Sequence, residues 1–149
     1  MEHPEQYSIG EMHWSKLTAD HGLYALEVYK VFIGDYCMTC EDTNDRTLND
    51  AHEHILNAFE AGKGVLLDSG TTDTYFPRAA EAIFHQVWEE KVGSPVEPSR
   101  KYTYEEFLRM PVVSVVFAPN ATIHAHPSSY MEGVRKCVVA LLYIMFGIS

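Results

Sequence analysis

Apolar residues recur with a helical period in the segment that follows Pro77. Pro77 suits the first turn of a helix, and Gly93 lies just beyond its expected end. The pattern predicts an amphipathic helix whose apolar face, including the aromatic residues, belongs to the core. The residues at positions i, i+3, i+4, i+7 and i+8 of this face are Ala80, Ile83, Phe84, Val87 and Trp88.

Other stretches of the chain have the pattern of β-strands. Residues 22–34, "GLYALEVYKVFIG", are rich in β-branched and aromatic residues and alternate polar with apolar positions over part of their length, which predicts a strand. Residues 111–117, "PVVSVVF", and 122–127, "TIHAHP", are separated by the turn sequence "APNA". This arrangement predicts a β-hairpin.

Three segments are less regular. Residues 35–50 hold clusters of Asn, Asp and Thr, which predicts a loop or an irregular hairpin arm. In residues 51–64 the run "HILNAF" precedes a glycine turn and is interpreted as a short strand, although Ala51, Ile55 and Phe59 would also suit one face of a helix. Thr103 and Glu106 have the spacing of a capping box, which predicts a second short helix at residues 103–110.

Together these elements predict a mainly β protein with short helices. The 149 residues are enough for one domain with a real core, and no linker or repeat divides the chain, so residues 1–149 are expected to form a single domain with residues 1–21 at its periphery. The last twelve residues, 138–149, are the most apolar stretch. A membrane span needs about 20 residues, so they are interpreted as a buried strand. Because a domain rarely stops in such a segment, we expect a truncated chain.

Charge and targeting signals narrow the function. The chain has 11 basic and 21 acidic residues and a net charge of −10, which disfavours nucleic acid or an anionic membrane as partner. The amino terminus has neither a basic start nor an apolar run, so no signal peptide is expected in these residues, and no membrane anchor is visible. Three cysteines do not decide the redox compartment.

The segment "VLLDSGTTDTYFP", residues 65–77, places a carboxylate at the end of an apolar run. Such a carboxylate loses hydration unless donors stabilise it, and Ser69, Thr71 and nearby amides are the obvious donors. Gly70 allows a tight turn and a close approach of the backbone. Two facing aspartates that share a proton can supply both an acid and a base, so Asp68 is a candidate for one member of such a pair.

This segment resembles the active-site strand and loop of pepsin-like aspartic proteases, in particular their carboxy-terminal lobe in the beta-secretase branch. The order of the neighbouring elements agrees, and the resemblance covers roughly residues 22–143. It implies one lobe of the pepsin-like double-psi β-barrel fold, incomplete here. It also implies peptide hydrolysis without a metal, a cofactor or a covalent intermediate.

The resemblance assigns a role to each residue of the motif. Asp68 corresponds to one catalytic aspartate, and Ser69 to the hydroxyl that bonds across to the matching loop of the other lobe. Gly70 makes the turn, Thr71 bonds the outer carboxylate oxygen, and Thr72 contacts bound peptide. The alternative is an aspartate that caps a turn at a strand end.

The chain also departs from the family pattern. It has no second Asp-[Ser/Thr]-Gly, and the amino-terminal lobe with its flap is missing. The late apolar-apolar-Gly strand, which runs beneath the active-site loop in the family, has only "IMFG", residues 144–147, as an approximate candidate. We therefore expect little proteolysis from the isolated chain. Homodimerisation could supply a second aspartate, but the lobes of retroviral-type proteases are smaller and each carries a flap.

Cysteine and histidine residues offer a metal-binding alternative. Cys37 and Cys40 form a C-x-x-C, followed by His52 and His54, a set that could bind zinc. A disulfide in this loop, or two free thiols with surface histidines, would explain them equally. The family resemblance implies a disulfide in which Cys137 pairs with Cys37 or Cys40.

Two smaller features complete the set of candidates. His124 and His126 alternate on the predicted hairpin and either bind a metal or are exposed histidines. Asn120 begins "NAT", a glycosylation acceptor on a predicted turn. This acceptor and the family resemblance both indicate a secretory, endomembrane or extracellular location.

The sequence therefore predicts one lobe of an aspartic endopeptidase, inactive alone. Its partners would be a peptide or protein substrate and the missing amino-terminal lobe. The alternatives are a non-catalytic lobe that binds a peptide or a protein partner, and the zinc module described above.

Overall fold

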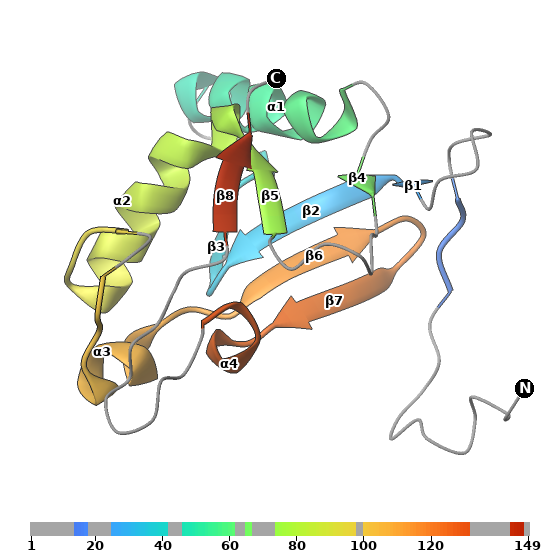
Figure 1. Cartoon of the computed structure of the whole chain (residues 1–149). Coiled ribbons are helices and arrows are strands. Elements are labelled where there is room, and N and C mark those ends of the chain that lie inside the picture. The colour runs from blue at the N-terminus through green and yellow to red at the C-terminus, as the bar shows by residue number, and fades with distance from the viewer. Residues whose placement is uncertain are drawn as a thin grey trace, which may run out of the picture.

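A four-stranded antiparallel sheet forms the base of the molecule, as the computed structural model in Figure 1 shows. Its strand order is β3 (Tyr36–Cys37), β2 (Val28–Ile33), β6 (Val113–Phe117) and β7 (Ala121–Ala125). The structure describes residues 14–17, 25–41, 46–61, 65–66, 74–97, 100–131 and 144–147, with side chains for all of these except 46–48 and 144–147.

The register of the sheet separates a buried face from an exposed one. Val31 pairs with Val115 and Ile33 pairs with Val113, and both β2 residues are fully buried. Lys30, which directly precedes Val31, is exposed. The pairing of β2 with β6 is irregular between Val28 and Lys30. One face of the sheet therefore supplies apolar side chains to the core, as the alternation of a strand requires.

Helices cover that buried face. α1 (Arg46–Glu60) contacts β2 and β5 (Thr74–Pro77), and α2 (Glu81–Val92) contacts β2. Figure 1 shows both helices on the same side of the sheet, together with β5 and β8 (Ile144–Gly147). The result is a layer of helices and a short strand pair over an antiparallel sheet.

Shorter helices stand at the ends of the long elements. The 3₁₀ turn η2 (Arg78–Ala80) leads from β5 directly into α2. α3 (Tyr104–Arg109) contacts α2, and α4 (Pro127–Tyr130) follows β7 and contacts it. No helix within the described ranges is long and apolar enough to cross a membrane.

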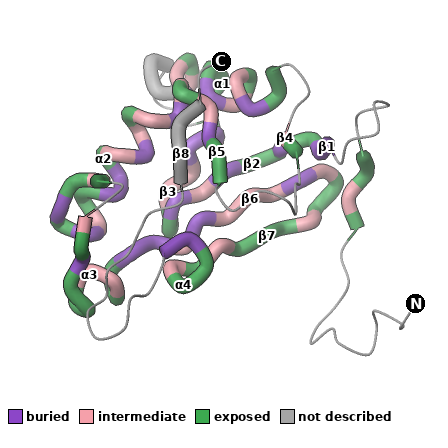
Figure 2. Tube along the Cα trace, in the orientation of Figure 1, coloured by how far each residue is buried: buried purple, intermediate pink, exposed green. Residues whose placement is uncertain are grey.

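The core is centred on aromatic side chains from α2. Trp88 and Phe84 are fully buried and stack with ring centroids 6.0 Å apart. The edges of Tyr102 and Tyr130 meet Trp88 at 6.1 and 6.3 Å. Figure 2 shows buried residues along α2, β2 and β6, and mostly exposed ones along β7. The core role expected for Trp88 is confirmed.

Two further strand pairs lie outside the main sheet. β1 (Ala25–Leu26) pairs antiparallel with β4 (Val65–Leu66), and β5 pairs parallel with β8. The described strands thus form antiparallel sheets and one parallel pair, and they do not close into a barrel. More of the described residues lie in helices than in strands, so the molecule is a mixed α/β domain. The expectation of a mainly β protein underestimated the helical content.

Several predicted elements are confirmed. The helix predicted after Pro77 is η2 followed by α2, and it ends at Gly93, whose φ of 81° is the left-handed conformation that glycine adopts without a Cβ clash. The capping box is present, with Thr103 accepting from the Glu106 amide. The hairpin predicted from the "APNA" turn is β6 and β7, with β7 starting at Ala121.

The strand predicted at "HILNAF" is wrong, because these residues belong to α1. The buried positions of this helix are His52, Ile55 and Phe59, with Leu56 half-buried. Their spacing is i, i+3, i+4 and i+7, which is the spacing of one helical face. The loop predicted for residues 35–50 correctly contains a hairpin arm at β3, but its last five residues already lie in α1.

The apolar carboxy-terminal run contains the strand that was expected there. Ile144–Gly147 forms β8, paired along its length with β5. The rest of the run, residues 138–143 and 148–149, lies outside the described residues, as do residues 1–13.

Candidate functional site

The acidic motif lies between two strands whose positions are described. Asp68, Ser69, Gly70, Thr71 and Thr72 are all outside the described residues, which stop at Leu66 and resume at Thr74. The structure therefore gives the entry to the motif and the exit from it. The roles expected for the five residues remain predictions.

β4, the strand that leads into the motif, is paired antiparallel with β1. Ala25 pairs with Leu66, and Leu26 pairs with Val65. Ala25 is fully buried and Leu26 is nearly so, while Leu66 is 42% exposed. The motif is thus entered from a short strand at the surface that is anchored on one side to buried backbone.

The strand that leaves the motif is fixed more firmly. Phe76 in β5 is buried, and its ring meets those of Phe59 and Phe84 edge to face at 5.5 and 5.9 Å. Such aromatic contacts add to the gain from burying the ring area. Phe76 therefore joins α1 to α2 immediately after the motif.

The parallel pair β5–β8 brings a distant segment to the exit of the motif. Thr74 pairs with Ile144 and Pro77 with Gly147, so the "IMFG" run lies alongside "TYFP". Parallel strands need a crossover connection, which here is the whole chain between the two strands. The run that the sequence offered as an approximate apolar-apolar-Gly strand therefore lies directly beside the strand that follows the motif.

A disulfide occupies the C-x-x-C. Cys37 and Cys40 are bonded to each other with a Cα–Cα distance of 5.4 Å, and both are half-buried. The loop disulfide considered as an alternative to zinc is therefore present, whereas the pairing with Cys137 that the family resemblance implied is not seen for either sulfur. Cys137 itself lies outside the described residues.

The zinc set does not assemble around this loop. Both sulfurs are used by the disulfide and are not thiolates, the form that binds zinc. His54 is exposed, whereas His52 is 5% exposed and is not the surface residue that was expected. Within the part of the chain that the structure describes, no group of three or more His, Cys, Asp or Glu residues could hold a metal ion.

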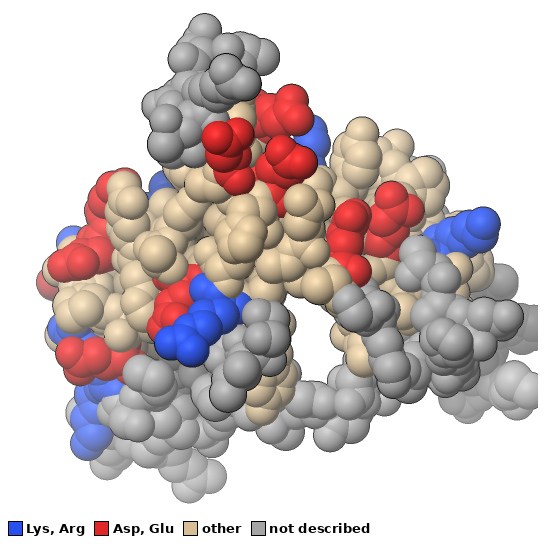
Figure 3. Space-filling view, turned by 90° about the horizontal axis from the view of Figure 1, so that it is seen from above, with Lys and Arg blue, Asp and Glu red and all other residues tan. Residues whose placement is uncertain are grey.

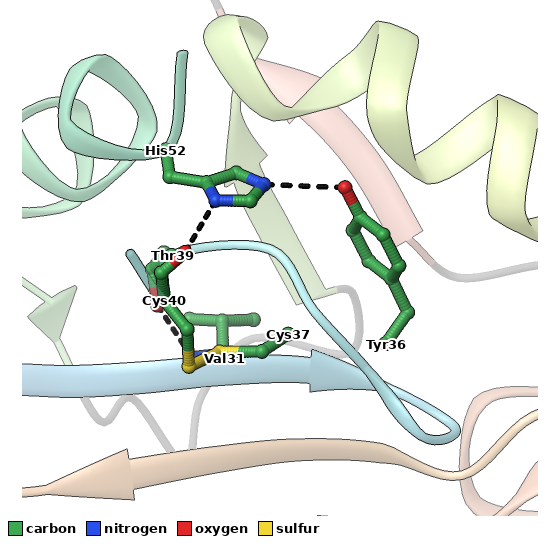
Figure 4. Close-up of a disulfide and its surroundings, with 6 residues drawn as sticks. All are labelled: Val31, Tyr36, Cys37, Thr39, Cys40 and His52. Atoms are coloured by element: carbon green, nitrogen blue, oxygen red, sulfur yellow. Dashed lines mark hydrogen bonds between the residues drawn. A yellow bond between two sulfur atoms is a disulfide. The ribbon is translucent and has the colours of Figure 1, made fainter. Parts of the chain in front are cut away.

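His52 instead forms a polar link between α1 and the hairpin (Figure 4). Its Nδ1 contacts the carbonyl oxygen of Cys40, and its Nε2 lies 3.2 Å from the hydroxyl of Tyr36. A carbonyl only accepts, so Nδ1 donates to Cys40, and in the tautomer with its proton on Nδ1 the Nε2 atom accepts from the Tyr36 hydroxyl. Burial raises the pKa of Tyr36, which keeps its hydroxyl a donor.

The loop is closed by further bonds to β2. The Val31 amide donates to the Thr39 hydroxyl at 3.0 Å, and the Met38 amide donates to the Val31 carbonyl at 2.8 Å. Met38 is fully buried. The hairpin arm that carries the disulfide is thus part of the packed sheet.

The two histidines of the hairpin are exposed and separated in role. His124 lies on β7, and its Nδ1 is 2.8 Å from the Ser114 hydroxyl on β6. His126 lies just after β7 at the start of α4 and makes no side-chain capping bond. Ser114 and His124 are directly paired residues of β6 and β7, so their contact is a cross-strand pair that stabilises the hairpin. The sequence pattern alone did not identify this contact.

The described basic and acidic side chains are spread over the surface, and some of them form ion pairs. On the face seen in Figure 3, acidic side chains stand in separate groups and the described basic side chains do not form a broad patch. Lys91 is paired with Asp35, whose pKa is lowered by the hydrogen bond from Lys91. Arg100 is paired with Glu106 at 2.8 Å.

Comparisons with protein-family models, with curated proteins and with solved structures find no match for this chain. We therefore base the functional proposal on the motif itself and on the elements that the structure places around it.

Proposed function

We propose that this chain supplies one half of the catalytic site of an aspartic endopeptidase, with Asp68 as one of two catalytic aspartates. The finer fold would be one lobe of the pepsin-like double-psi β-barrel. The observation that carries the proposal is the run "VLLDSGTTDTYFP", which begins with β4, paired with β1, and ends with β5, paired with β8, with the polar residues of the motif between them in the sequence.

The strand beside the exit of the motif gives further support. The family resemblance implies an apolar-apolar-Gly strand next to the active-site loop. In this chain "IMFG" forms β8 and pairs in parallel with β5. The helix that follows β5, with Phe84 and Trp88 in the core, also matches the expected order of elements.

The proposed chemistry is hydrolysis by a bound water. Two facing carboxylates share one proton, so that one is a base and the other an acid. The base takes a proton from water as its oxygen attacks the peptide carbonyl carbon, and the acid protonates the carbonyl oxygen. Collapse of the hydrated intermediate then breaks the C–N bond, with a proton passing to the leaving nitrogen. Neither a metal nor a covalent intermediate is involved.

The neighbours of Asp68 would position this carboxylate. Thr71 would donate to its outer oxygen, Ser69 would bond across to the matching loop, and Gly70 would make the turn between them. Thr72 would contact the bound peptide. A hydroxyl that bonds the ionised carboxylate favours the charged form and so keeps one member of the pair a base.

The second carboxylate would come from another lobe. The 149 residues contain only one Asp-[Ser/Thr]-Gly, so these residues by themselves are expected to be inactive. The partners of the lobe would be a matching amino-terminal lobe and a peptide or protein substrate. The location would be secretory, endomembrane or extracellular.

The test uses the natural polypeptide that contains this sequence, purified with its matching lobe and assayed with a fluorogenic peptide at acidic pH. A statine-containing peptide, which mimics the hydrated carbonyl, is expected to block cleavage. Asp68→Asn is expected to lower kcat by at least about a hundredfold, because an amide cannot exchange the proton.

Asp73→Asn is the matched control, since Asp73 lies in the same segment but outside the motif. This variant is expected to keep its activity. Full activity in Asp68→Asn, or an equal loss in both variants, would contradict the catalytic role of Asp68.

The second candidate function is a non-catalytic lobe that binds a peptide or a protein partner. The single Asp-[Ser/Thr]-Gly favours it. The two functions differ in a simple measurement: a non-catalytic lobe would bind the statine peptide or its partner without cleaving any substrate, and its longest natural polypeptide would contain no second motif.

A further inference from the structure

The turn between β6 and β7 presents an acceptor sequence for glycosylation at the surface. Asn120 is the last residue of this turn and is exposed, and Thr122 is exposed in the first half of β7. Together with Ala121 they form Asn-Ala-Thr, the acceptor triplet for N-linked glycosylation, with no proline in the middle position. The Ser15 hydroxyl donates to the carbonyl of Ala118 in the same turn, and the Asn120 side chain stays exposed.

We propose that Asn120 carries an N-linked glycan and that this glycan shields the exposed edge of β7. The reaction transfers an oligosaccharide from a lipid-diphosphate donor. The Asn120 amide nitrogen forms a bond to C1 of the first sugar as the bond from C1 to the diphosphate oxygen breaks. The lipid diphosphate leaves, and the amide proton passes to a base of the transferase.

The disulfide is an independent observation that supports an oxidising compartment for the chain. Disulfides persist in secreted proteins and in the secretory pathway and are rare in the reducing cytosol. The Cys37–Cys40 bond is formed in the folded chain, and both residues are half-buried and thus within reach of reductants. An oxidising compartment keeps such a bond, and in eukaryotic cells it is also the compartment of N-glycosylation.

The place of β7 in the sheet explains what the glycan would do. β7 pairs with β6 on one side and is the last strand in the order of the described sheet. An edge strand offers unpaired amides and carbonyls to other chains, and proteins protect it with charged residues or proline. The five residues of β7, "ATIHA", contain neither, and Ile123 is 47% exposed.

The two ends of β7 differ in their cover. α4 follows the carboxy-terminal end of the strand and contacts it, as Figure 1 shows. The amino-terminal end starts directly after Asn120. A glycan on Asn120 would therefore protect the end of the edge strand that α4 leaves open. The opposite edge strand, β3, is only two residues long and needs less protection.

The first test is a mass measurement on the protein from its natural source. Treatment with peptide-N-glycosidase is expected to lower the mass by that of a glycan and to convert Asn120 into Asp in the peptide map. In a eukaryotic secreting cell, Asn120→Gln and Thr122→Val are expected to remove the glycan, and Thr122→Ser is expected to keep it. A natural protein without the mass change, or a glycan that persists in both variants, would overturn the modification.

The second test concerns the shielding and uses light scattering at equal protein concentration. Enzymatically deglycosylated wild-type protein and Asn120→Gln are expected to self-associate several-fold more than the glycosylated protein. Ile123→Lys in the Asn120→Gln background is expected to restore the monomer, because a charge blunts the same edge. If the deglycosylated protein stays as monomeric as the glycosylated one, the glycan does not shield β7.

Discussion

The two long helices, α1 before the acidic motif in the sequence and α2 after it, are held in different ways. α2 follows the motif and buries Phe84, Val87, Trp88 and Val92, with aromatic contacts on several sides. α1 precedes it and buries a narrower strip in which His52 is a polar member. The helix after the motif is held by apolar packing, whereas the helix before it also depends on hydrogen bonds to the disulfide loop.

The difference has consequences for stability and for position. Apolar packing is strong and non-directional, so it fixes α2 with little dependence on pH or redox state. The His52 bonds are directional and link α1 to two particular groups, the Cys40 carbonyl and the Tyr36 hydroxyl. Such a link fixes the position of α1 relative to the disulfide loop. Removing one partner lowers the free energy of unfolding, because the other polar group is then left without a hydrogen bond in the interior.

The largest expected effect is in the α2 core. Trp88→Ala is expected to lower the free energy of unfolding by about 3–5 kcal/mol, because it removes a fully buried ring and leaves a cavity between Phe84, Tyr102 and Tyr130. Urea denaturation followed by circular dichroism measures this. Glu89→Ala, at an exposed position of the same helix, is the control and should change the value by less than about 0.5 kcal/mol.

If Trp88→Ala and Glu89→Ala lowered the free energy of unfolding by the same small amount, the contrast between the two helices would not hold, because α2 would then not be held by its apolar face.

The α1 link is expected to be worth less. His52→Ala leaves the Cys40 carbonyl and the Tyr36 hydroxyl without the ring between them, so unfolding should become easier by about 1–3 kcal/mol. Native-state hydrogen exchange is the sharper measurement, since amides of α1 should exchange faster while those of α2 keep their protection.

His54→Ala provides the matched control, since His54 is an exposed histidine two residues further along the same helix. It should leave both the stability and the exchange rates of α1 unchanged. If His52→Ala accelerates exchange in α2 as much as in α1, the polar link is not local to α1, and the contrast between the helices does not hold.

The same contrast explains how far the sequence predicts the fold. α2 was predictable because its buried positions are all apolar and so give a clear helical period. α1 was not, because one of its four face positions is His52, and counting histidine as polar reduces the pattern to the short run around Ile55. Reading His52 as a member of the buried face would have given the spacing i, i+3, i+4, i+7.

Pairings between distant segments were predictable only in part. The β6–β7 hairpin is local, and its turn residues identify it. The parallel pairing of Thr74–Pro77 with Ile144–Gly147 depends on how the whole intervening chain folds, which no local pattern records. For the candidate site, the motif and its flanking apolar runs are visible in the sequence, but the disulfide partner of Cys37 is not, because spacing alone does not choose among three cysteines.

The smallest expected effect on stability concerns the amino-terminal cap of α3, the short helix that packs against α2. Thr103 caps α3, and Glu106 accepts from the Thr103 amide at 2.7 Å and from Arg100 at 2.8 Å. Thr103→Ala is expected to cost about 1 kcal/mol. An exposed polar cap should therefore matter less to stability than the buried polar link of His52.

This cap also has a predictable pH dependence. The hydrogen bond from the Thr103 amide, the largest cause, holds the pKa of Glu106 below its usual value of 4.5. A carboxyl whose pKa is lower in the folded state contributes stability above its unfolded pKa and loses it as pH falls through the folded pKa. Glu106→Gln is therefore expected to destabilise the protein at neutral pH and to have less effect once pH falls below that folded value. Urea titrations over this pH range, with the exposed neighbour Glu105→Gln as control, would refute the assignment if both variants lost stability in parallel at every pH.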